Sequence, residues 1–376
     1  MTDSLSLVML ARGRRPGPAW LQAMDHILLA VARDTLARAA NLFDRVVVAT
    51  PDREWGESLR DLGVELDIDL PGAPFHFGRR LADLVTRLSL DRIVYVGMAS
   101  APLLSRDDLA AIAQAAREAT SSVIANNLHS TDWAAIVPAR AVIGQPDRLH
   151  ADSALGWVLS QEVGLTPRAW PRSPASLLDV DTPLDALIAA RHPAAGPGLR
   201  SAVDASGWPG GRLDAAQWVM ATPDRRLTLI GRVPSWSMSL LEQKTQCWVR
   251  VFSEERGMRA SRRMVSGGVR SLVANYLEAV GAQQFFADLA GMADAALIDS
   301  RVILAARCAW PDDADRFASD LLMPEAIGDP FLRDFTRAAA ACPIPILLGG
   351  HSLVSAGVWA MLESVKREAS HRDASR

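Results

Sequence analysis

The chain is poor in lysine: Lys244 and Lys366 are the only two among its 40 lysine and arginine residues. Any contact with a phosphate group would therefore come from arginine side chains or from backbone N–H groups. A net charge of −3 over 376 residues leaves no basic excess of the kind that polyanion-binding proteins carry. We therefore expect no nucleic-acid partner.

Cysteine is scarce as well. Cys247, Cys308 and Cys342 are odd in number and far apart, which excludes a disulfide framework and a cysteine-based zinc site. The sequence also lacks an apolar run of membrane-spanning length and a basic segment at its start. We expect a cytoplasmic protein without a signal peptide and without a membrane partner.

Strand-like and helix-like segments alternate along the chain. Short apolar runs predict buried strands, and apolar residues at helical spacing predict helices between them, with strands at 5–11, 45–50, 64–70 and 92–97 and helices at 23–41, 54–62 and 79–88. This alternation predicts an α/β fold with a mostly parallel sheet. We expect a first domain over 1–192, a linker rich in glycine and proline over 193–222, and a second, smaller Rossmann-like α/β domain over 223–376.

Ligands of parallel α/β sheets gather beyond the carboxyl ends of the strands, so the loops that follow strands hold the candidate residues. The first such loop, Arg12-Gly13-Arg14-Arg15, follows Leu10 and Ala11 and offers guanidinium and backbone N–H groups to a phosphate chain. It has neither the Walker spacing nor the GxGxxG spacing, and a solvated basic turn is the alternative interpretation.

An acidic stretch, Asp179-Val180-Asp181, precedes Thr182-Pro183. Thr182 is a suitable helix cap and Pro183 a suitable first helical residue, so the loop before this helix should be stiff. At least one of the two carboxylates would then be held where a divalent cation could meet it. The alternative is an acidic helix start without a ligand.

Two further loops are candidate sites. The polar loop between two predicted strands, with Asn127, His129 and Asp132, suits an acceptor pocket. In the second half, Arg232 ends an apolar strand, and Gly349-Gly350-His351-Ser352 lies between a strand and a helix, where glycines let the backbone approach an anion. A tight turn that needs glycine explains the latter segment equally well.

The order of these segments resembles the nucleotidyltransferases of the GT-A type, a group that includes molybdenum-cofactor guanylyltransferase. Leu10-Ala11-Arg12-Gly13-Arg14 matches the signature loop of that family, Ser100-Ala101-Pro102 its Asp-x-Pro segment, and residues 179–185 its late Asp-x-Asp-Thr-Pro-x-Asp segment. The resemblance covers roughly the first half of the chain, and we recognise no family in the second half.

The resemblance implies an NTP as substrate and Mg²⁺ as cofactor. An acceptor phosphate or hydroxyl would attack the α-phosphate and release pyrophosphate. By position, Arg12, Arg15 and Asp181 would be catalytic, and Asp181 with Asp179 would hold the metal. Nucleotide binding would fall to residues 10–15, to Ser100 and to Phe75, which lies in the loop that approaches the base.

Two positions depart from the family pattern. Ser100 stands where the family has a metal-binding aspartate, and the lysine that usually follows the first loop is missing. Two alternatives follow: a catalytically degenerate regulatory protein that binds a nucleotide or nucleotide-sugar, and a glycosyltransferase that uses a nucleotide-sugar. The predicted partners are a nucleotide and a phosphorylated small molecule, with a homodimer as the assembly to test.

Overall fold

The computed structural model describes residues 4–69, 74–258, 261–350 and 352–373, with the backbone alone from residue 366 onward. The chain forms two compact units. The first contains residues 1–15, 28–179 and 196–198. The second contains residues 16–27, 180–195 and 199–376.

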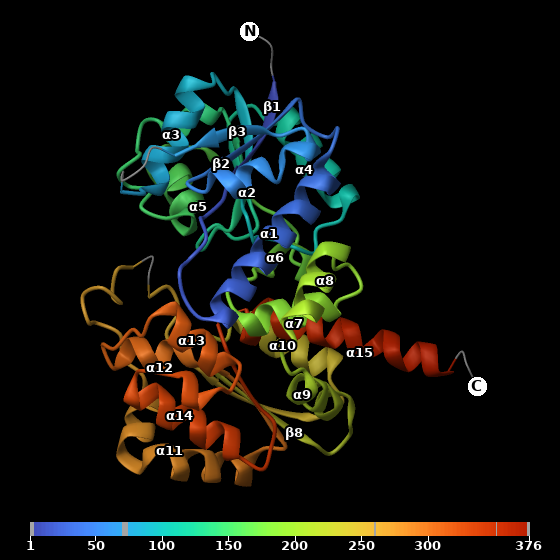
Figure 1. The fold of residues 1–376 in the computed structure, drawn as a ribbon, viewed down its shortest axis with the longest axis vertical. Helices are drawn as coiled ribbons and strands as arrows, with labels where there is room; N and C mark the ends of the chain where they lie inside the picture. Colours follow the sequence, from blue (N-terminus) through green and yellow to red (C-terminus); the bar gives the residue numbers. More distant parts are fainter. Residues whose placement is uncertain (1–3, 70–73, 259–260, 351, 374–376) are drawn as a thin grey trace. The chain divides into compact units, whose positions relative to one another are not determined.

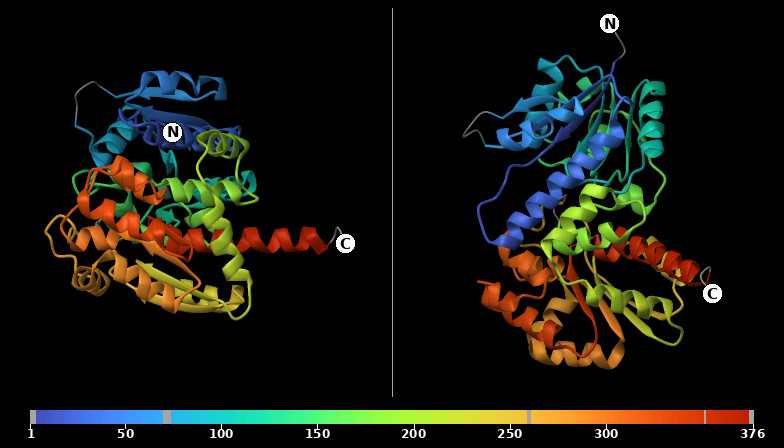
Figure 2. Two further views of the ribbon diagram at one scale, coloured as in Figure 1. Left: turned by 60° about the horizontal axis from the view of Figure 1, so that its bottom comes forward. Right: turned by 45° about the vertical axis from the view of Figure 1, so that its right-hand side comes forward.

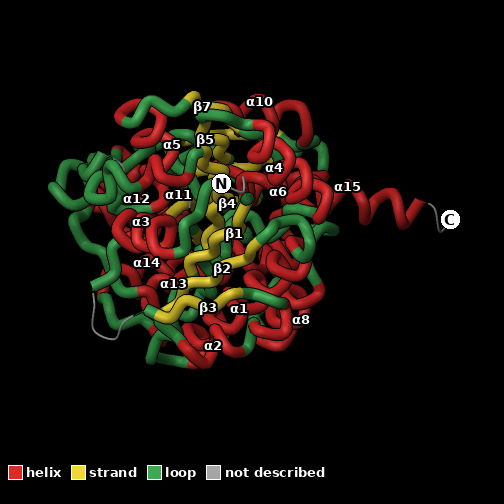
Figure 3. The backbone as a smooth tube through the Cα atoms, turned by 90° about the horizontal axis from the view of Figure 1, so that it is seen from above, coloured by secondary structure: helices red, strands yellow, loops and turns green. Residues whose placement is uncertain are grey.

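The first unit is built on a seven-stranded sheet. Its strands run in the order β3-β2-β1-β4-β6-β5-β7, and β6 is antiparallel to β4 and β5 whereas the other pairs are parallel. Their bounds are β1 Leu5–Leu10, β2 Arg45–Thr50, β3 Glu65–Ile68, β4 Arg92–Gly97, β5 Ser122–Ala125, β6 Trp133–Val137 and β7 Thr166–Ala169. Figure 3 shows β3, β2, β1 and β4 side by side. The predicted α/β class with a mostly parallel sheet is confirmed.

Helices cover both faces of this sheet, because its strands are apolar on both sides. On one face α3 (Phe77–Arg87) and α5 (Leu155–Trp157) enclose a core that includes Val8, Leu81 and Ile93. On the other face lie α4 (Arg106–Glu118) and the C-terminal part of α1 (Ala19–Ala39) (Figures 1 and 3). Both faces of the sheet are therefore covered by helices.

Short helices occupy the connections of the first unit. They are α2 Arg53–Glu57, η1 Arg60–Leu62, η2 Ala139–Val142, η3 Asp152–Ala154, η4 Val158–Glu162 and α6 Pro174–Leu177. The single helix predicted over 54–62 is therefore two short ones. Asp52 caps α2, and the left-handed Gly63 ends η1, with φ of 72°.

The second unit contains a parallel four-stranded sheet. The strand order is β11-β10-β8-β9, with bounds β8 Arg226–Gly231, β9 Trp248–Ser253, β10 Ala295–Asp299 and β11 Ile346–Gly349. The helices at 272–341, drawn in orange in Figures 1 and 2, cover one face, and α9 packs on the other. Their bounds and those of the remaining helices are α7 Pro183–Arg191, α8 Pro197–Ser206, α9 Gly211–Ala221, α10 Ser235–Lys244, α11 Leu272–Met292, α12 Ser300–Ala306, α13 Asp313–Asp320, η5 Pro324–Ala326, α14 Pro330–Ala341, η6 Leu353–Gly357 and α15 Val358–Asp373.

The structure differs from the predicted domain boundaries. Residues 193–222, expected as a linker, contain α8 and α9, and α9 packs against β8, β10 and β11. The glycines and prolines that suggested a linker mark helix starts instead, since Pro197 begins α8 and Gly210 precedes α9. Because it also takes residues 16–27 and 180–195, the second unit is the larger of the two, although its sheet is smaller. Within the described residues, the helices are too short or too polar to cross a membrane.

Candidate functional site

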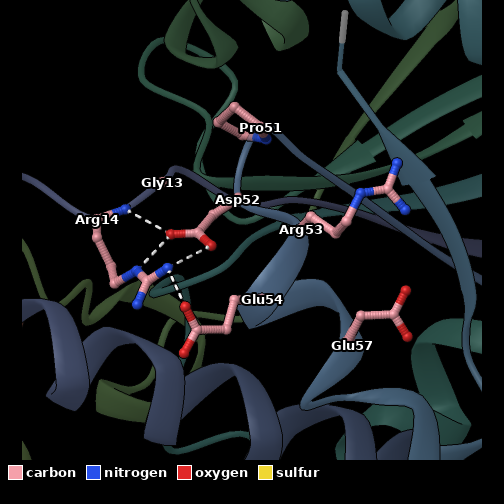
Figure 4. Close-up of a pocket in the computed structure, with 7 residues that line it drawn as sticks. All are labelled: Gly13, Arg14, Pro51, Asp52, Arg53, Glu54 and Glu57. Atoms are coloured by element: carbon pink, nitrogen blue, oxygen red, sulfur yellow. Dashed lines mark hydrogen bonds and ion pairs between the residues drawn. The ribbon is translucent and has the colours of Figure 1, made fainter. Parts of the chain in front are cut away.

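The loop after β1 lies against the loop after β2. Arg14 donates from Nε to Asp52 Oδ2 over 2.7 Å and from Nη2 to Glu54 Oε2 over 2.6 Å. The Asp52 side chain also accepts from the backbone N–H of Trp55, and Asp52 thereby caps α2. Figure 4 shows the Arg14 guanidinium pointing toward both carboxylates.

These ion pairs alter the pKa values of both partners. The hydrogen bonds that Arg14 donates to Asp52 and Glu54 raise the pKa of Arg14 above its ordinary value. Burial is the largest single effect on Asp52 and acts to raise its pKa, but the hydrogen bonds from Arg14 and from the backbone N–H of Trp55, together with the charge of Arg14, outweigh it, so the pKa is lowered. Both side chains are therefore charged at neutral pH, and the Arg14 charge, which we predicted to cradle phosphate, is offset by two carboxylates.

An open pocket of about 710 Å³ lies between these two loops. Its lining is Gly13, Arg14, Pro51, Asp52, Arg53, Glu54 and Glu57 (Figure 4). Gly13 lies close to Pro51 in the loop after β2, since a Cβ atom on Gly13 would be 3.3 Å from Pro51 Cγ. Sequence analysis missed the acidic lining, although Asp52 stands two residues beyond a predicted strand.

The other residues predicted for nucleotide binding lie around the same loops. Leu10, at the end of β1, and Ala11 are half-buried, Arg12 is exposed and Arg15 is half-buried. Phe75, in the loop that leads to α3, has 67% of its surface exposed. Residues 70–73 of that loop lie outside the described residues.

Ser100 and Asp179 lie together at the carboxyl end of β4. The two residues form a single antiparallel backbone bridge, and Ala101 N donates to Leu178 O over 3.0 Å. β4 is the direct neighbour of β1, with Gly97 paired to Leu10. The structure therefore brings Ser100, Asp179 and the loop after β1 to one edge of the sheet. Asp181 is exposed and belongs to the second unit.

Ser100 is closely packed. It is 4% exposed, and a Cβ atom on Gly97 would lie only 2.6 Å from Ser100 Oγ. Asp179 is half-buried. A carboxylate and a hydroxyl oxygen suit Mg²⁺, which in proteins is usually held by one or two carboxylates together with substrate phosphates and water. Among the residues that the structure describes, no group of three or more acidic, histidine or cysteine side chains could hold a metal by itself. Asp179 and Ser100 are therefore the described residues at this edge that could contribute oxygen ligands to a metal arriving with a nucleotide.

A buried tyrosine at the same edge is hydrogen-bonded to a carboxylate. Tyr95, in β4, donates from its hydroxyl to Asp152 Oδ2 over 3.0 Å. Burial raises the pKa of Tyr95 well above its ordinary value, and the negative charges of Asp152, Asp179 and Asp132 raise it further. Tyr95 therefore stays a neutral hydrogen-bond donor. Sequence analysis missed Tyr95 and Asp152, because Tyr95 reads as one more apolar residue of a buried strand.

The loop predicted to bind the acceptor follows β5 at this edge. Asn126 Nδ2 donates to Asp132 Oδ2 over 2.6 Å, and Asp132 N donates back to Asn126 Oδ1 over 3.0 Å. Asn127 Oδ1 accepts from the backbone N–H of His129 over 3.0 Å. The loop is thus held by its own side chains, with His129 exposed and Asp132 half-buried.

In the second unit, the two parts of the predicted ligand loop lie at the ends of different strands. Arg232, after β8, donates to both carboxylate oxygens of Asp299 over 2.6 and 3.0 Å. Gly349 is the last residue of β11 and Gly350 follows it, and β10 lies between β11 and β8. Gly350 packs within 3.6 Å of Asp185 Oδ2, measured from a Cβ atom placed on it. Ser352 is buried, and His351 lies outside the described residues. Arg232 is therefore held in an ion pair with Asp299, and Gly350 lies close to the start of α7.

Comparison with known proteins gives no family assignment: no family model and no curated sequence matches the chain. Several solved structures match about half of the chain, with low TM-scores. One is a nucleotide-diphospho-sugar transferase, described as putative, from Desulfovibrio desulfuricans, with 14% identity over 51% of this chain and 87% of that one and a TM-score of 0.39. Another is a cytidylyltransferase from Leptospira borgpetersenii, with 13% identity, 54% and 95% coverage and a TM-score of 0.37. A Mycobacterium tuberculosis protein in complex with manganese matches at 21% identity, 48% and 95% coverage and a TM-score of 0.32. Similarity at this level assigns no function.

Proposed function

We propose that the first unit is a nucleotidyltransferase that moves an NMP group from an NTP to a phosphorylated small molecule. An oxygen of the acceptor phosphate attacks the α-phosphorus of the NTP. The bond from that phosphorus to the oxygen bridging toward the β-phosphorus breaks, and pyrophosphate leaves with the electron pair. A phosphate monoester is largely dianionic at neutral pH, since its second pKa is about 6, so the attack needs no general base.

One observation carries this proposal: the order of the candidate groups along one edge of the first sheet. The pocket lies at the ends of β2 and β1, Ser100 and Asp179 at the end of β4, and the Asn127–Asp132 loop beside β6 and β5. The distance from β1 to β5 is three strand spacings, roughly 14 Å at about 4.8 Å each. A nucleotide and an acceptor can therefore lie end to end along this edge.

The charges along the edge suggest how a nucleotide would lie. The carboxylates of Asp52, Glu54 and Glu57 repel phosphates and accept hydrogen bonds, so they suit the N–H groups of a base. Arg12 and Arg15 would hold the phosphates. Asp179, together with the Ser100 hydroxyl, would hold a Mg²⁺ ion that enters with them, and such an ion neutralises negative charge on the phosphates. Asp181 is the second predicted ligand, and its contribution is tested separately.

Release of pyrophosphate is the direct test. The protein is incubated with each of the four common NTPs, Mg²⁺ and a panel of sugar phosphates and other phosphorylated metabolites, and pyrophosphate is measured by a coupled assay. We expect Mg²⁺-dependent release. In Asp179→Asn the rate should fall at least about a hundredfold, because a metal-held charge contributes several kcal/mol to such a transition state.

Asp181→Asn is the matched control for that variant, since it removes the same charge two residues away. We expect it to retain more activity than Asp179→Asn, because Asp181 is exposed and Asp179 lies beside Ser100. Equal activity of Asp179→Asn and wild type would contradict the assignment of Asp179. Absence of pyrophosphate release with every NTP and acceptor would contradict the enzyme.

The acidic lining also makes a prediction about the base. Guanine and cytosine present amino groups to hydrogen-bond acceptors, whereas uracil has only its single ring N–H. We expect GTP and CTP to bind more tightly than UTP in titration calorimetry with Mg²⁺. Glu54→Gln should reduce this preference, because an amide presents donors as well as an acceptor. Equal affinity for the three nucleotides would show that the base does not contact these carboxylates.

The close packing of Ser100 favours a second candidate, a binding protein without turnover. With 4% exposure and Gly97 against it, Ser100 leaves little room for a fully coordinated metal. This candidate predicts that an NTP raises the melting temperature while no pyrophosphate forms, because a ligand that binds only the folded state stabilises it. Pyrophosphate release by the wild type would exclude it.

A further inference from the structure

An exposed aromatic pair lies at the acceptor side of the first sheet. Trp157, at the end of α5, has half of its surface exposed (50%). Its ring centroid lies 5.8 Å from that of His129, with an angle of 38° between the ring planes. Tryptophan is highly buried on average, so a half-exposed indole beside a candidate acceptor loop is a candidate ligand contact.

The two segments that carry these rings are locked together. Gly156 N donates to Thr131 Oγ1 over 3.0 Å, and the same hydroxyl donates to Asn127 O over 2.8 Å. A Cβ atom on Gly156 would lie 2.6 Å from Leu128 O, so only glycine allows this approach. The rings therefore stand on a backbone that is ordered before any ligand arrives, which lowers the entropy cost of binding.

The same two segments also carry carboxylates. Asp132 follows His129 in the loop and accepts from Asn126 Nδ2 over 2.6 Å. Asp152 precedes α5 and accepts from the Tyr95 hydroxyl over 3.0 Å. Carboxylates accept hydrogen bonds from hydroxyl groups, and such charge-assisted bonds are stronger than neutral ones. This part of the edge therefore combines one exposed aromatic face with acceptors for several hydroxyl donors.

We propose that Trp157 and His129 form a platform for the ring of a sugar phosphate, whose hydroxyl groups donate to Asp132 and Asp152. A pyranose presents a flat face of C–H groups and a rim of hydroxyls, and the negative face of an indole attracts those C–H groups. This inference rests on the proposed function in one respect: the phosphate of the bound sugar is the nucleophile. β5 and β4 are two strand spacings apart, about 10 Å, a distance that a ring with one phosphate substituent can cover.

The test compares a ring with an open chain. Titration calorimetry measures the affinity of the full-length protein for glucose 1-phosphate, mannose 1-phosphate and N-acetylglucosamine 1-phosphate, and for sorbitol 6-phosphate, which has hydroxyls but no ring. The variants are Trp157→Ala, Trp157→Phe and, as a control, Trp218→Ala, which removes a 55% exposed tryptophan from α9. GTP and CTP are titrated in parallel.

We expect at least one ring-form phosphate to bind more tightly than sorbitol 6-phosphate. Trp157→Ala should weaken that binding roughly fivefold to tenfold, the size of one aromatic stacking contact, whereas Trp157→Phe and Trp218→Ala stay near wild type. Nucleotide affinity should be the same in all variants. A ring-form phosphate that binds Trp157→Ala as tightly as wild type would overturn the platform, and so would loss of nucleotide affinity in Trp157→Ala, which would place the base on the indole.

The two proposals fail differently. If none of the sugar phosphates binds while nucleotides bind and another acceptor gives pyrophosphate, the sugar platform is wrong and the transferase stands. If a sugar phosphate binds in a Trp157-dependent manner while no nucleotide binds and no pyrophosphate forms, the platform stands and the transferase is wrong.

Discussion

Asp185 is a carboxylic acid enclosed at the first turn of α7. It is fully buried, and its Oδ2 accepts from Thr182 Oγ1 over 2.9 Å while its Oδ1 has no hydrogen-bond partner. Burial raises its pKa well above the ordinary value, and the charge of Asp181 raises it further. The folded protein therefore holds a proton on Asp185 that the unfolded chain releases at a lower pH.

This raised pKa makes stability depend on pH. The pKa of Asp185 is higher in the folded state than in the unfolded chain, where it is about 3.9. Below about pH 3.9 the protonated Asp185 makes its full contribution to stability. This contribution is lost as the pH rises through the folded-state pKa. Asp185→Asn keeps the shape without the charge. We expect it to melt higher than wild type at pH 8, where a gain of 1 kcal/mol corresponds to roughly 2–4 °C, and at nearly the same temperature near pH 4.

Differential scanning calorimetry from pH 4 to pH 8 measures this difference. Asp204→Asn, which changes an exposed aspartate in α8, is the control and should follow wild type throughout. If Asp185→Asn melted at a lower temperature than wild type at pH 8, this result would contradict the prediction. It would show that the hydrogen bond of the buried carboxyl group stabilises the fold by more than its burial destabilises it.

Helix caps were the local features that sequence predicted best. The sequence Ser105-Arg106-Asp107-Asp108 predicts a helix that Ser105 caps, with both aspartates in the first turn, and in the structure Ser105 and Asp108 form a reciprocal capping box at α4. Thr182 caps α7 as predicted, with Pro183 as the first helical residue. These interactions join residues three apart, so sequence spacing determines them.

The cap of α4 yields an energetic prediction. Ser105→Ala removes the side-chain acceptor for the Asp108 N–H, which should lower the free energy of unfolding by about 1 kcal/mol. Chemical denaturation measures it, with Ser121→Ala at an exposed position as the control, where we expect a change below about 0.5 kcal/mol. No difference between the two variants would mean that solvent replaces the cap.

Elements without a clear pattern were missed. β10 lies between β11 and β8 in the second sheet and is buried throughout. Its sequence, Ala-Ala-Leu-Ile-Asp, is short and rich in alanine, so it does not stand out as a strand. β7 is exposed along its whole length and contains Pro167, which argues against a strand until its place at the sheet edge is known. Both strands owe their existence to pairing with distant neighbours, which periodicity does not report.

At the scale of the molecule, the alternation of strands and helices was enough to predict the α/β class, but not the contacts that build the candidate site. Tyr95 and Asp152 are 57 positions apart, and Arg14 and Asp52 are 38 apart. Such pairs follow from the strand order, in which β1 lies between β2 and β4. The predicted acidic stretch is divided as well, since Asp179 belongs to the first unit and Asp181 to the second.

The central claim is that a nucleotide and its metal bind at the carboxyl edge of the first sheet. The most direct measurement is a crystal structure of the protein with Mn²⁺ and a non-hydrolysable NTP analogue, in which anomalous scattering locates the ion. We predict the ion in direct contact with a carboxylate oxygen of Asp179, with the triphosphate along the ends of β1 and β4 and the base toward Asp52. A nucleotide bound at the ends of β8 and β10, or an ion that does not contact Asp179, would contradict this account.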